Sequence, residues 1–210
     1  SDVVSVATGS NSSKTQNLSL QQAPFTVPDP VSTSFNCANA KKISLSNGTE
    51  ISIPANAIKP ASINSCTAGD SSSNITVTVS PTTQMSLQDK SVPVGVGYEI
   101  TARDSNGSEI SDTFSSNVTI TIPYSDQEIE TSVGGVVDES LLGNGYWDTS
   151  TSAWRNVSSE VLDTDNNDLT ISTNHFTLFG VLAATDPSVT SGSEEESSDS
   201  EATSSASASD

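Results

Sequence analysis

Apolar side chains recur at every second position along most of the chain after residue 40. Two such runs, which end at Leu45 and Ile53, flank an Asn47-Gly48 pair. Strict alternation is typical of a half-buried strand, and Asn-Gly between two alternating runs is a strong hairpin signal. Further alternating runs, separated by turn-forming residues, cover 75–79, 92–100, 118–124 and 169–182. At least seven short strands, without a long stretch of helical period, predict an all-β fold, an antiparallel β-sandwich.

The positions between the apolar ones are filled mainly by hydroxyl residues rather than by charges. The chain contains 42 Ser and 24 Thr among its 210 residues. Because the side chains of a strand alternate between its two faces, one face of each predicted sheet should be in water and carry hydroxyl groups.

Acidic residues outnumber basic ones, with 26 Asp and Glu against 7 Lys and Arg, which gives a formal net charge of −19. No nucleic-acid partner is expected, because phosphate contacts need clustered Lys and Arg. No membrane span is expected either, because no apolar run reaches the ~18–20 residues that a spanning helix requires. With one His and two Cys, the ligands of zinc, haem and iron–sulfur sites are lacking, so no cofactor is predicted.

Composition divides the chain into three parts. Residues 1–35 are predicted to form an irregular N-terminal arm, and residues 36–186 the β-sandwich domain. Residues 187–210 contain six acidic residues, no basic residue and almost no apolar side chain. This segment cannot bury enough apolar surface to offset the cost of ordering its backbone, about 1–2 kcal/mol per residue. It is therefore predicted to be a disordered acidic tail.

The two cysteines, Cys37 and Cys66, lie in polar surroundings and have no CxxC spacing. An isolated pair in an acidic, Ser/Thr-rich chain is most simply a disulfide formed in an oxidising compartment. Closing a loop of roughly 30 residues would stabilise the fold by roughly 3.6 kcal/mol in the chain-entropy model. The alternative is a pair of free buried thiols in a cytosolic protein. The first residues are neither basic nor followed by an apolar run, which favours the mature N-terminus of a secreted or cell-surface protein.

The single histidine, His175, is followed by Phe176 and Thr177 within the last alternating run. In a regular strand, side chains two positions apart leave the same face, so His175 and Thr177 should lie together on the apolar side. One interpretation is a half-buried His with a satisfied hydrogen bond beside a Thr that favours strands. The other is self-cleavage, in which the Thr177 oxygen attacks the Phe176 carbonyl, His175 takes the proton and the resulting ester is hydrolysed.

Five segments resemble, in sequence order, bacterial extracellular ZU5-like β-sandwich domains, and the resemblance covers roughly residues 41–183. The segments are Ser44–Ile58, Val96–Ile100, Val118–Tyr124, Tyr146-Trp147-Asp148 with Trp154, and His175–Phe179. The resemblance implies a module of a secreted or surface protein, or a spacer and interaction module. Some ZU5 and related domains cleave themselves between Phe and Ser of a His-Phe-Ser motif. Here that bond corresponds to Phe176–Thr177, with the more hindered hydroxyl of Thr in place of Ser.

A cluster of oxygen ligands, Asp163, Asp165 and Asp168, has the density that Ca²⁺ favours. The segment lacks the Gly and the closing Glu of an EF-hand loop, and a connection between two strands would by itself select Asp and Asn. The sequence therefore leaves a calcium site and a plain turn as alternatives.

Three aromatic residues, Tyr146, Trp147 and Trp154, could stack on sugar rings if they are exposed. In a symmetric hairpin, Trp147 would face Trp154 across the two strands. Trp in a sandwich more often belongs to the core, so a carbohydrate-binding module is one of the alternatives.

Together these features predict a non-catalytic, extracellular or cell-surface module with a structural or interaction role in a surface, matrix or filament assembly. Its partners would be other surface or matrix proteins, or further copies of the chain that associate through the N-terminal arm. The alternatives are a self-cleaving domain that cuts between Phe176 and Thr177, and a carbohydrate-binding module.

Overall fold

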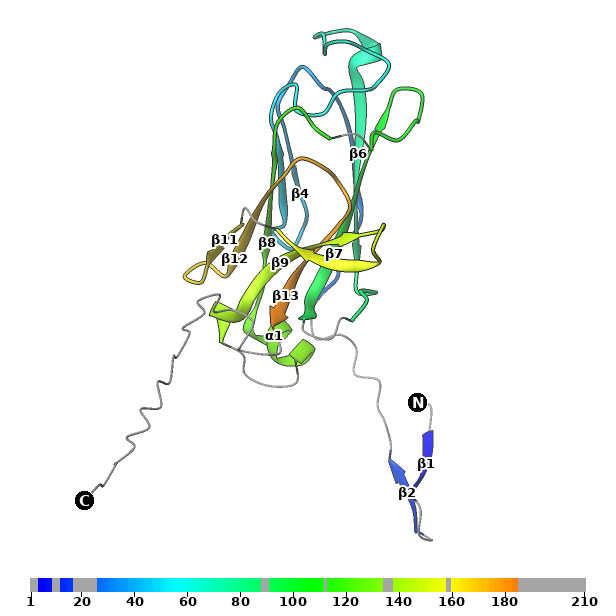
Figure 1. The fold of residues 1–210 in the computed structure, drawn as a ribbon, viewed down its shortest axis with the longest axis vertical. Coiled ribbons are helices and arrows are strands. Elements are labelled where there is room, and N and C mark those ends of the chain that lie inside the picture. The colour runs from blue at the N-terminus through cyan, green and yellow to red at the C-terminus, as the bar shows by residue number, and fades with distance from the viewer. Residues whose placement is uncertain are drawn as a thin grey trace, which may run out of the picture.

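The computed structural model describes residues 4–8, 12–16, 26–87, 91–111, 113–133, 138–157 and 160–184. Within these ranges the chain forms two antiparallel sheets that pack as layers, and a separate two-stranded sheet (Figure 1). The prediction of an antiparallel β-sandwich is therefore confirmed. The tail predicted at 187–210 lies outside the described residues.

The larger sheet contains the last strand of the described chain near its centre. In spatial order, its six strands are Ala153–Asn156 (β10), Leu142–Asp148 (β9), Leu178–Ala184 (β13), Ser91–Asp104 (β7), Asn74–Thr82 (β6) and Val31–Asn36 (β3). Strand β13 is thus hydrogen-bonded on both sides, to β9 and to β7.

The smaller sheet has five strands. In spatial order, these are Glu160–Asp163 (β11), Asp168–Thr173 (β12), Val118–Pro123 (β8), Glu50–Ile53 (β5) and Lys41–Ser44 (β4). The predicted hairpin around Asn47-Gly48 joins β4 to β5, and Gly48 has a φ of +94°, which suits a residue without a side chain.

The hydrophobic core lies between the two sheets. Three isoleucines, Ile51, Ile120 and Ile171, are in register across β5, β8 and β12, and each is 0% exposed. Val77 and Phe179 of the larger sheet are also 0% exposed. Since full burial of such a side chain contributes about 1.5–3 kcal/mol, this double layer accounts for the fold of a chain with few apolar residues.

Hydroxyl side chains pair across neighbouring strands, as the alternation with Ser and Thr predicts. Ser32 and Ser34 of β3 lie 3.0 and 2.8 Å from Thr78 and Thr76 of β6, measured between hydroxyl oxygens. The exposed face of the larger sheet is thus covered here by neutral, hydrogen-bonded hydroxyl groups. Such cross-strand hydroxyl pairs are a recognised source of sheet stability.

The N-terminal arm differs from its prediction in two respects. Strand Val4–Thr8 (β1) pairs with strand Ser12–Gln16 (β2) in an antiparallel hairpin, so the arm is not wholly irregular. Strand β3 begins at Val31 and pairs with β6 along its whole length, so the sandwich begins before the predicted boundary at residue 35.

The sequence predicted one strand over the last alternating run, but the structure has two. Strand β12 ends at Thr173 in the smaller sheet, residues 174–177 bend, and β13 starts at Leu178 in the larger sheet. The chain therefore crosses from one layer to the other through the segment that contains His175. The expected common face of His175 and Thr177, which assumed a regular strand, does not apply.

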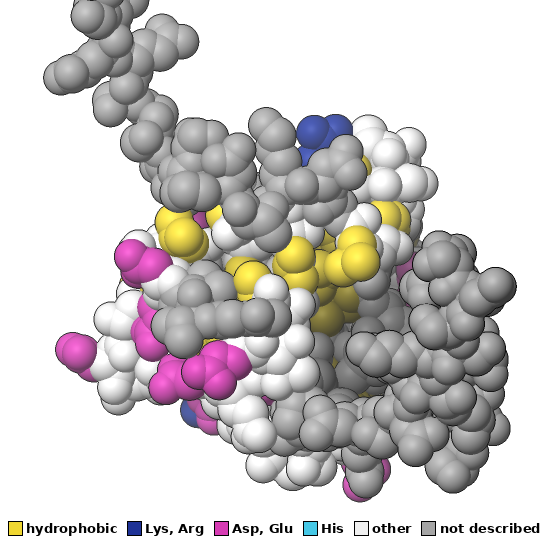
Figure 2. Space-filling model, turned by 90° about the horizontal axis from the view of Figure 1, so that it is seen from below, with side chains coloured by type: hydrophobic (Ala, Val, Ile, Leu, Met, Phe, Trp, Pro, Cys, Tyr) yellow, Lys and Arg dark blue, Asp and Glu magenta, His cyan; other side chains and the backbone are white. Residues whose placement is uncertain are grey.

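A short helix, Asp126–Val133 (α1), lies against β7 at one end of the sandwich, and two 3-10 turns span Ser71–Ser73 and Glu139–Leu141. The Ser125 hydroxyl accepts a hydrogen bond from the Glu128 amide, and Ile129 is the buried contact of this helix. Within the described ranges, no helix is long and apolar enough to cross a bilayer. Figure 2 views this end of the molecule and shows acidic side chains gathered beside apolar ones.

The cysteine pair is joined as predicted. Cys37 and Cys66 form a disulfide with a Cα–Cα distance of 5.5 Å, which ties the residue after β3 to the long connection between β5 and β6. Cys37 is 2% exposed and belongs to the core. The bond fits the oxidising compartment that the sequence suggests.

Candidate functional site

The segment 174–177 is held at both ends by backbone hydrogen bonds to other parts of the chain. The Asn174 carbonyl accepts from the Phe114 amide at 2.7 Å, and the Thr177 carbonyl accepts from the Ile100 amide at 3.0 Å. The ring of Phe176 packs edge-on against Phe114, with ring centroids 4.8 Å apart. The peptide bond between Phe176 and Thr177 therefore lies in a fixed bend between the two sheets.

His175 is half-buried in this bend. Its Nδ1 lies 3.2 Å from the Thr173 hydroxyl oxygen and 3.4 Å from Asn174 Oδ1. Its ring also makes an edge contact with Tyr146 of β9, with centroids 4.9 Å apart. Burial lowers the pKa of His175, because the charged imidazolium loses hydration. The imidazole is therefore neutral at pH 7, which is the form that accepts a proton.

Thr177 makes a different contact from the one that the sequence suggested. Its hydroxyl donates a hydrogen bond to the Trp147 carbonyl oxygen at the end of β9, at 2.8 Å. In the described part of the chain, no hydrogen bond joins the His175 ring to the Thr177 hydroxyl. The resting structure thus places nucleophile and base candidates in one bend but pairs each with another group.

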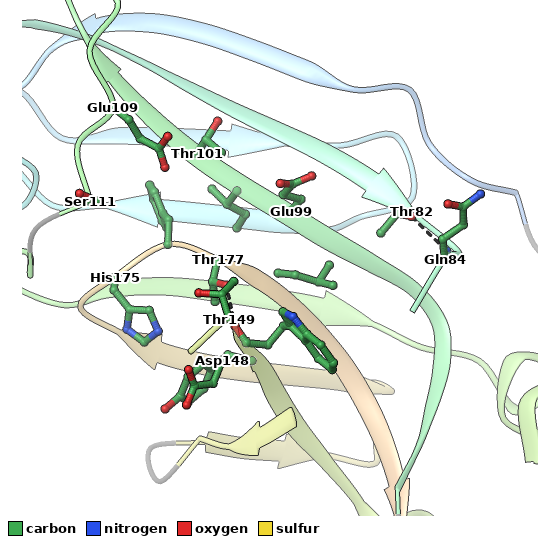
Figure 3. Close-up of a pocket in the computed structure, with 15 residues that line it drawn as sticks. Thr82, Gln84, Glu99, Thr101, Glu109, Ser111, Asp148, Thr149, His175 and Thr177 are labelled. Atoms are coloured by element: carbon green, nitrogen blue, oxygen red, sulfur yellow. Dashed lines mark hydrogen bonds between the residues drawn. The ribbon is translucent and has the colours of Figure 1, made fainter. Parts of the chain in front are cut away.

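An open cavity of about 740 Å³ lies beside the bend (Figure 3). His175, Phe176 and Thr177 line it together with residues of β7 and β9 and of the connections that follow them. Three acidic side chains, Glu99, Glu109 and Asp148, also line it. The residues on both sides of the Phe176–Thr177 bond thus border a space that is open to water.

Asp148, although it lines the cavity, is occupied by the turn between β9 and β10. Its carboxylate accepts hydrogen bonds from the hydroxyls of Ser150 and Thr151, at 2.6 and 2.8 Å, and these donors hold its pKa well below the usual range. Arg155 adds an exposed ion pair at 3.4 Å. Asp148 is therefore ionised and stabilises a turn.

The calcium candidates do not converge as a metal site. Asp163 Oδ1 accepts from the amides of Asp165 and Asn166, both at 3.1 Å, and Oδ2 accepts from the Asn166 side chain. Asp168 starts β12 on the other side of this turn. Among the described residues, no three His, Cys, Asp or Glu side chains are grouped so that they could hold a metal ion. The Asp- and Asn-rich segment is a hairpin turn between β11 and β12.

Of the three glycan-stacking candidates, Trp154 is only 5% exposed. Its indole packs over Gly145 of β9 and Gly180 of β13, which leave room because glycine has no side chain. Its Nε1 donates to the Ser86 carbonyl at 2.8 Å. Trp147 does face Trp154 across the hairpin, edge-on at 5.7 Å. Tyr146 is in contact with His175. The three rings do not form one exposed platform.

Sequence reasoning missed two groups that contact the bend. One is Thr173. Its position two residues before His175 indicates a contact with the His175 ring only when the bend at 174–177 is known. The other is the Trp147 carbonyl, a backbone atom that no side-chain pattern reveals.

Comparison with models of known protein families gives a match over most of the chain. The family model described as "GPS: GAIN subdomain B" matches residues 5–187. No curated protein matches the chain. The match does not confirm the resemblance to ZU5-like domains, but it agrees with it in pointing to a β-rich domain of the extracellular type. Domains of this kind occur in extracellular or cell-surface proteins, in agreement with the disulfide. Since the match spans most of its length, the chain belongs to the GAIN subdomain B family.

Proposed function

We propose that this domain cleaves its own backbone between Phe176 and Thr177. The observation that carries the proposal is the position of His175, Phe176 and Thr177 in the fixed bend between the two sheets, beside an open cavity. GPS domains are autoproteolytic in some proteins, which supports the same conclusion. The domain would act as a self-processing module of an extracellular or cell-surface protein.

The reaction needs only the groups of this bend and water. Thr177 Oγ1 attacks the Phe176 carbonyl carbon while the neutral His175 ring takes the hydroxyl proton. Collapse of the tetrahedral intermediate breaks the peptide C–N bond, and the proton passes from His175 to the leaving Thr177 nitrogen. Phe176 is then linked to Thr177 through an ester. Water hydrolyses this ester and leaves a carboxylate at Phe176 and a free amine at Thr177.

The hydrogen bond of the Thr177 hydroxyl must break before the reaction can begin. The Thr177 hydroxyl has to leave the Trp147 carbonyl, a rotation about the Thr177 side-chain bond that costs about one neutral hydrogen bond, roughly 0.5–1.5 kcal/mol. The backbone around the bond remains held by the Phe114 and Ile100 amides. Rotation of the Thr177 side chain is therefore the first movement that the reaction requires.

Cleavage is expected to leave the domain assembled. Strand β13, which follows the cut, is paired with β7 on one side and with β9 on the other. Phe179, Val181 and Ala183 of this strand are each no more than 1% exposed. The strand should stay in place through these contacts after the peptide bond is lost.

The experiment is mass spectrometry of the protein under native and denaturing conditions. Under denaturing conditions we expect one fragment that ends at Phe176 and one that begins at Thr177. Under native conditions we expect the two fragments to stay together. Only the intact chain, after prolonged incubation at neutral pH, would refute self-cleavage.

The cleavage rate should fall in acid. Since burial holds the pKa of His175 below its usual value near 6.5, the base is neutral above that range and becomes protonated only below it. The rate should be nearly constant from pH 7 to 8 and drop as the pH passes below the usual histidine range. Quenched time courses between pH 4.5 and 8 measure this, and a rate that rises steeply between pH 7 and 8 would contradict it.

A second candidate is an uncleaved structural or interaction module of a surface, matrix or filament assembly. It is favoured by one observation, the engagement of the Thr177 hydroxyl with the Trp147 carbonyl instead of with the imidazole. Its partners would be other surface proteins or copies of the chain joined through the arm that contains β1 and β2. Sedimentation of the chain with and without residues 1–20 tests the role of the arm, because unchanged self-association would dispose of it.

A further inference from the structure

Thr173 is the last residue of β12 and precedes His175 by two positions. It is 6% exposed, one of the few polar side chains buried among the described residues. Its Oγ1 lies 3.2 Å from His175 Nδ1 and 3.2 Å from the His175 carbonyl oxygen. The sandwich therefore buries a hydroxyl against both the side chain and the backbone of the candidate base.

One arrangement of the hydrogen atoms satisfies every contact of the Thr173 hydroxyl. In this arrangement the Thr173 hydroxyl donates its one hydrogen to the His175 carbonyl oxygen, which can only accept, and its oxygen accepts from the His175 amide at 3.4 Å. The lone pairs of Thr173 Oγ1 then face His175 Nδ1. The second atom near Nδ1, Asn174 Oδ1 at 3.4 Å, is also an acceptor. With two acceptors beside it, Nδ1 carries the hydrogen in this arrangement, whereas in the opposite tautomer Nδ1 would take the Thr173 hydrogen and leave the His175 carbonyl oxygen without it.

In a neutral imidazole only one ring nitrogen carries a hydrogen, so the other is the base. With the hydrogen on Nδ1, the lone pair is on Nε2. Nδ1 and its partners lie at the end of β12, and the ring borders the cavity that Phe176 and Thr177 also line. The ring nitrogen that has no partner in β12 is thus the one that remains for the reaction.

We propose that Thr173 is a positioning residue for the self-cleavage proposed above: its oxygen holds the hydrogen of His175 on Nδ1 and so presents Nε2 as the proton acceptor. The role is that of the group that orients a catalytic histidine from its far side. Here a neutral hydroxyl performs it, so the orientation carries no added charge.

No carboxylate replaces Thr173 in this role. The charged and titratable side chains that border the same cavity are Glu99 of β7, Glu109 after β7, and Tyr146 and Asp148 of β9. None of them makes a hydrogen bond or ion pair with the His175 ring in the described part of the chain. Burial is the cause of the low pKa of His175.

The tautomer can be read directly, because His175 is the only histidine of the chain. Long-range ¹H–¹⁵N correlation spectra of the Thr177→Ala protein, which cannot cleave itself, distinguish the protonated from the unprotonated ring nitrogen. We expect Nδ1 to be protonated at pH 7.5. In the Thr173→Val, Thr177→Ala protein we expect a mixture of both tautomers. A ring protonated on Nε2 in the first protein would overturn the proposal.

Cleavage kinetics provide the second readout. In pulse-labelled chains we expect Thr173→Val to slow cleavage about 10-fold, a small part of the 10²–10⁴-fold that a general base contributes. Thr173→Ser, which restores the hydroxyl, should recover the rate. Thr170→Val is the matched control, since it removes a hydroxyl of the same strand that pairs with Thr121 instead. This control should cleave like the wild type.

The pH profile separates positioning from a loss of structure. The Thr173 oxygen accepts from Nδ1 and stabilises the imidazolium more than the neutral ring, so its removal should move the acid limb of the rate to lower pH. A slower variant whose acid limb is unmoved would indicate a purely structural role. Wild-type cleavage that Thr173→Val leaves unchanged would overturn this proposal alone. An intact wild-type chain would overturn the proposed function with it, even if the tautomer is as expected.

Discussion

Replacing Thr177 by Ala should abolish cleavage completely. The substitution removes the attacking oxygen. Thr177 directly follows Phe176, so its hydroxyl is the one placed next to the Phe176 carbonyl by the chain itself. Only a full-length species should remain in denaturing mass spectra after days at neutral pH. Thr177→Ser keeps a hydroxyl, and a less hindered one, so this variant should cleave at least as fast as the wild type.

His175→Ala belongs to the same set, because it leaves the nucleophile and removes the base. The rate should fall by about 10²–10⁴-fold, the usual contribution of a general base.

The Thr177→Ala protein must remain folded for these two variants to be informative. Loss of its hydrogen bond to the Trp147 carbonyl should cost only about 0.5–1.5 kcal/mol. Cleavage that persists in Thr177→Ala would show that another nucleophile acts.

Phe179→Ala should cost about 3–5 kcal/mol of folding free energy, the usual range for removing a buried aromatic ring. Phe179 is 0% exposed on β13, between β7 and β9, so neighbouring strands cannot easily close over the gap. Urea unfolding of the Thr177→Ala protein with and without this substitution measures the effect on an uncleaved chain. Complete loss of the native domain would also agree with this expectation.

Val161→Ala is the matched control for this experiment. Val161 lies on the edge strand β11 and is 65% exposed, so its truncation should change the free energy of unfolding by less than about 0.5 kcal/mol. A cost below about 1 kcal/mol for Phe179→Ala would mean that β13 contributes little to the core. The expectation that β13 stays bound after cleavage would then fail as well.

The parts of the fold that depend on neighbouring residues could be predicted. The hairpins β4–β5 and β11–β12 follow from local alternation and from turn residues such as Asn47-Gly48. The crossing at residues 174–177 could not. Thr173 and Phe179 are buried at positions of the same parity, so the alternation continues across the bend although the strand does not. Which sheet each half joins depends on distant partners, β8 for β12 and β7 for β13.

The candidate site shows the same division. The residue types His175, Phe176 and Thr177 suggested the chemistry from the sequence alone. The contacts that control it come from Thr173, an ordinary strand residue by its type, and from the carbonyl of Trp147. The residue type of Trp154 left two positions open, the core, where Trp is more often found, and an exposed sugar-stacking surface. Gly145 and Gly180 make room for the buried indole, and they lie side by side only when β9 pairs with β13.

Both tryptophans of the protein, Trp147 and Trp154, lie in the β9–β10 hairpin. The tryptophan fluorescence of the whole molecule therefore originates in one place, and one of the two tryptophans contributes the carbonyl that accepts from the Thr177 hydroxyl. Tryptophan fluorescence is for this reason a local reporter of the neighbourhood of the Phe176–Thr177 bond, and a change in its spectrum would record a change in that corner of the sandwich.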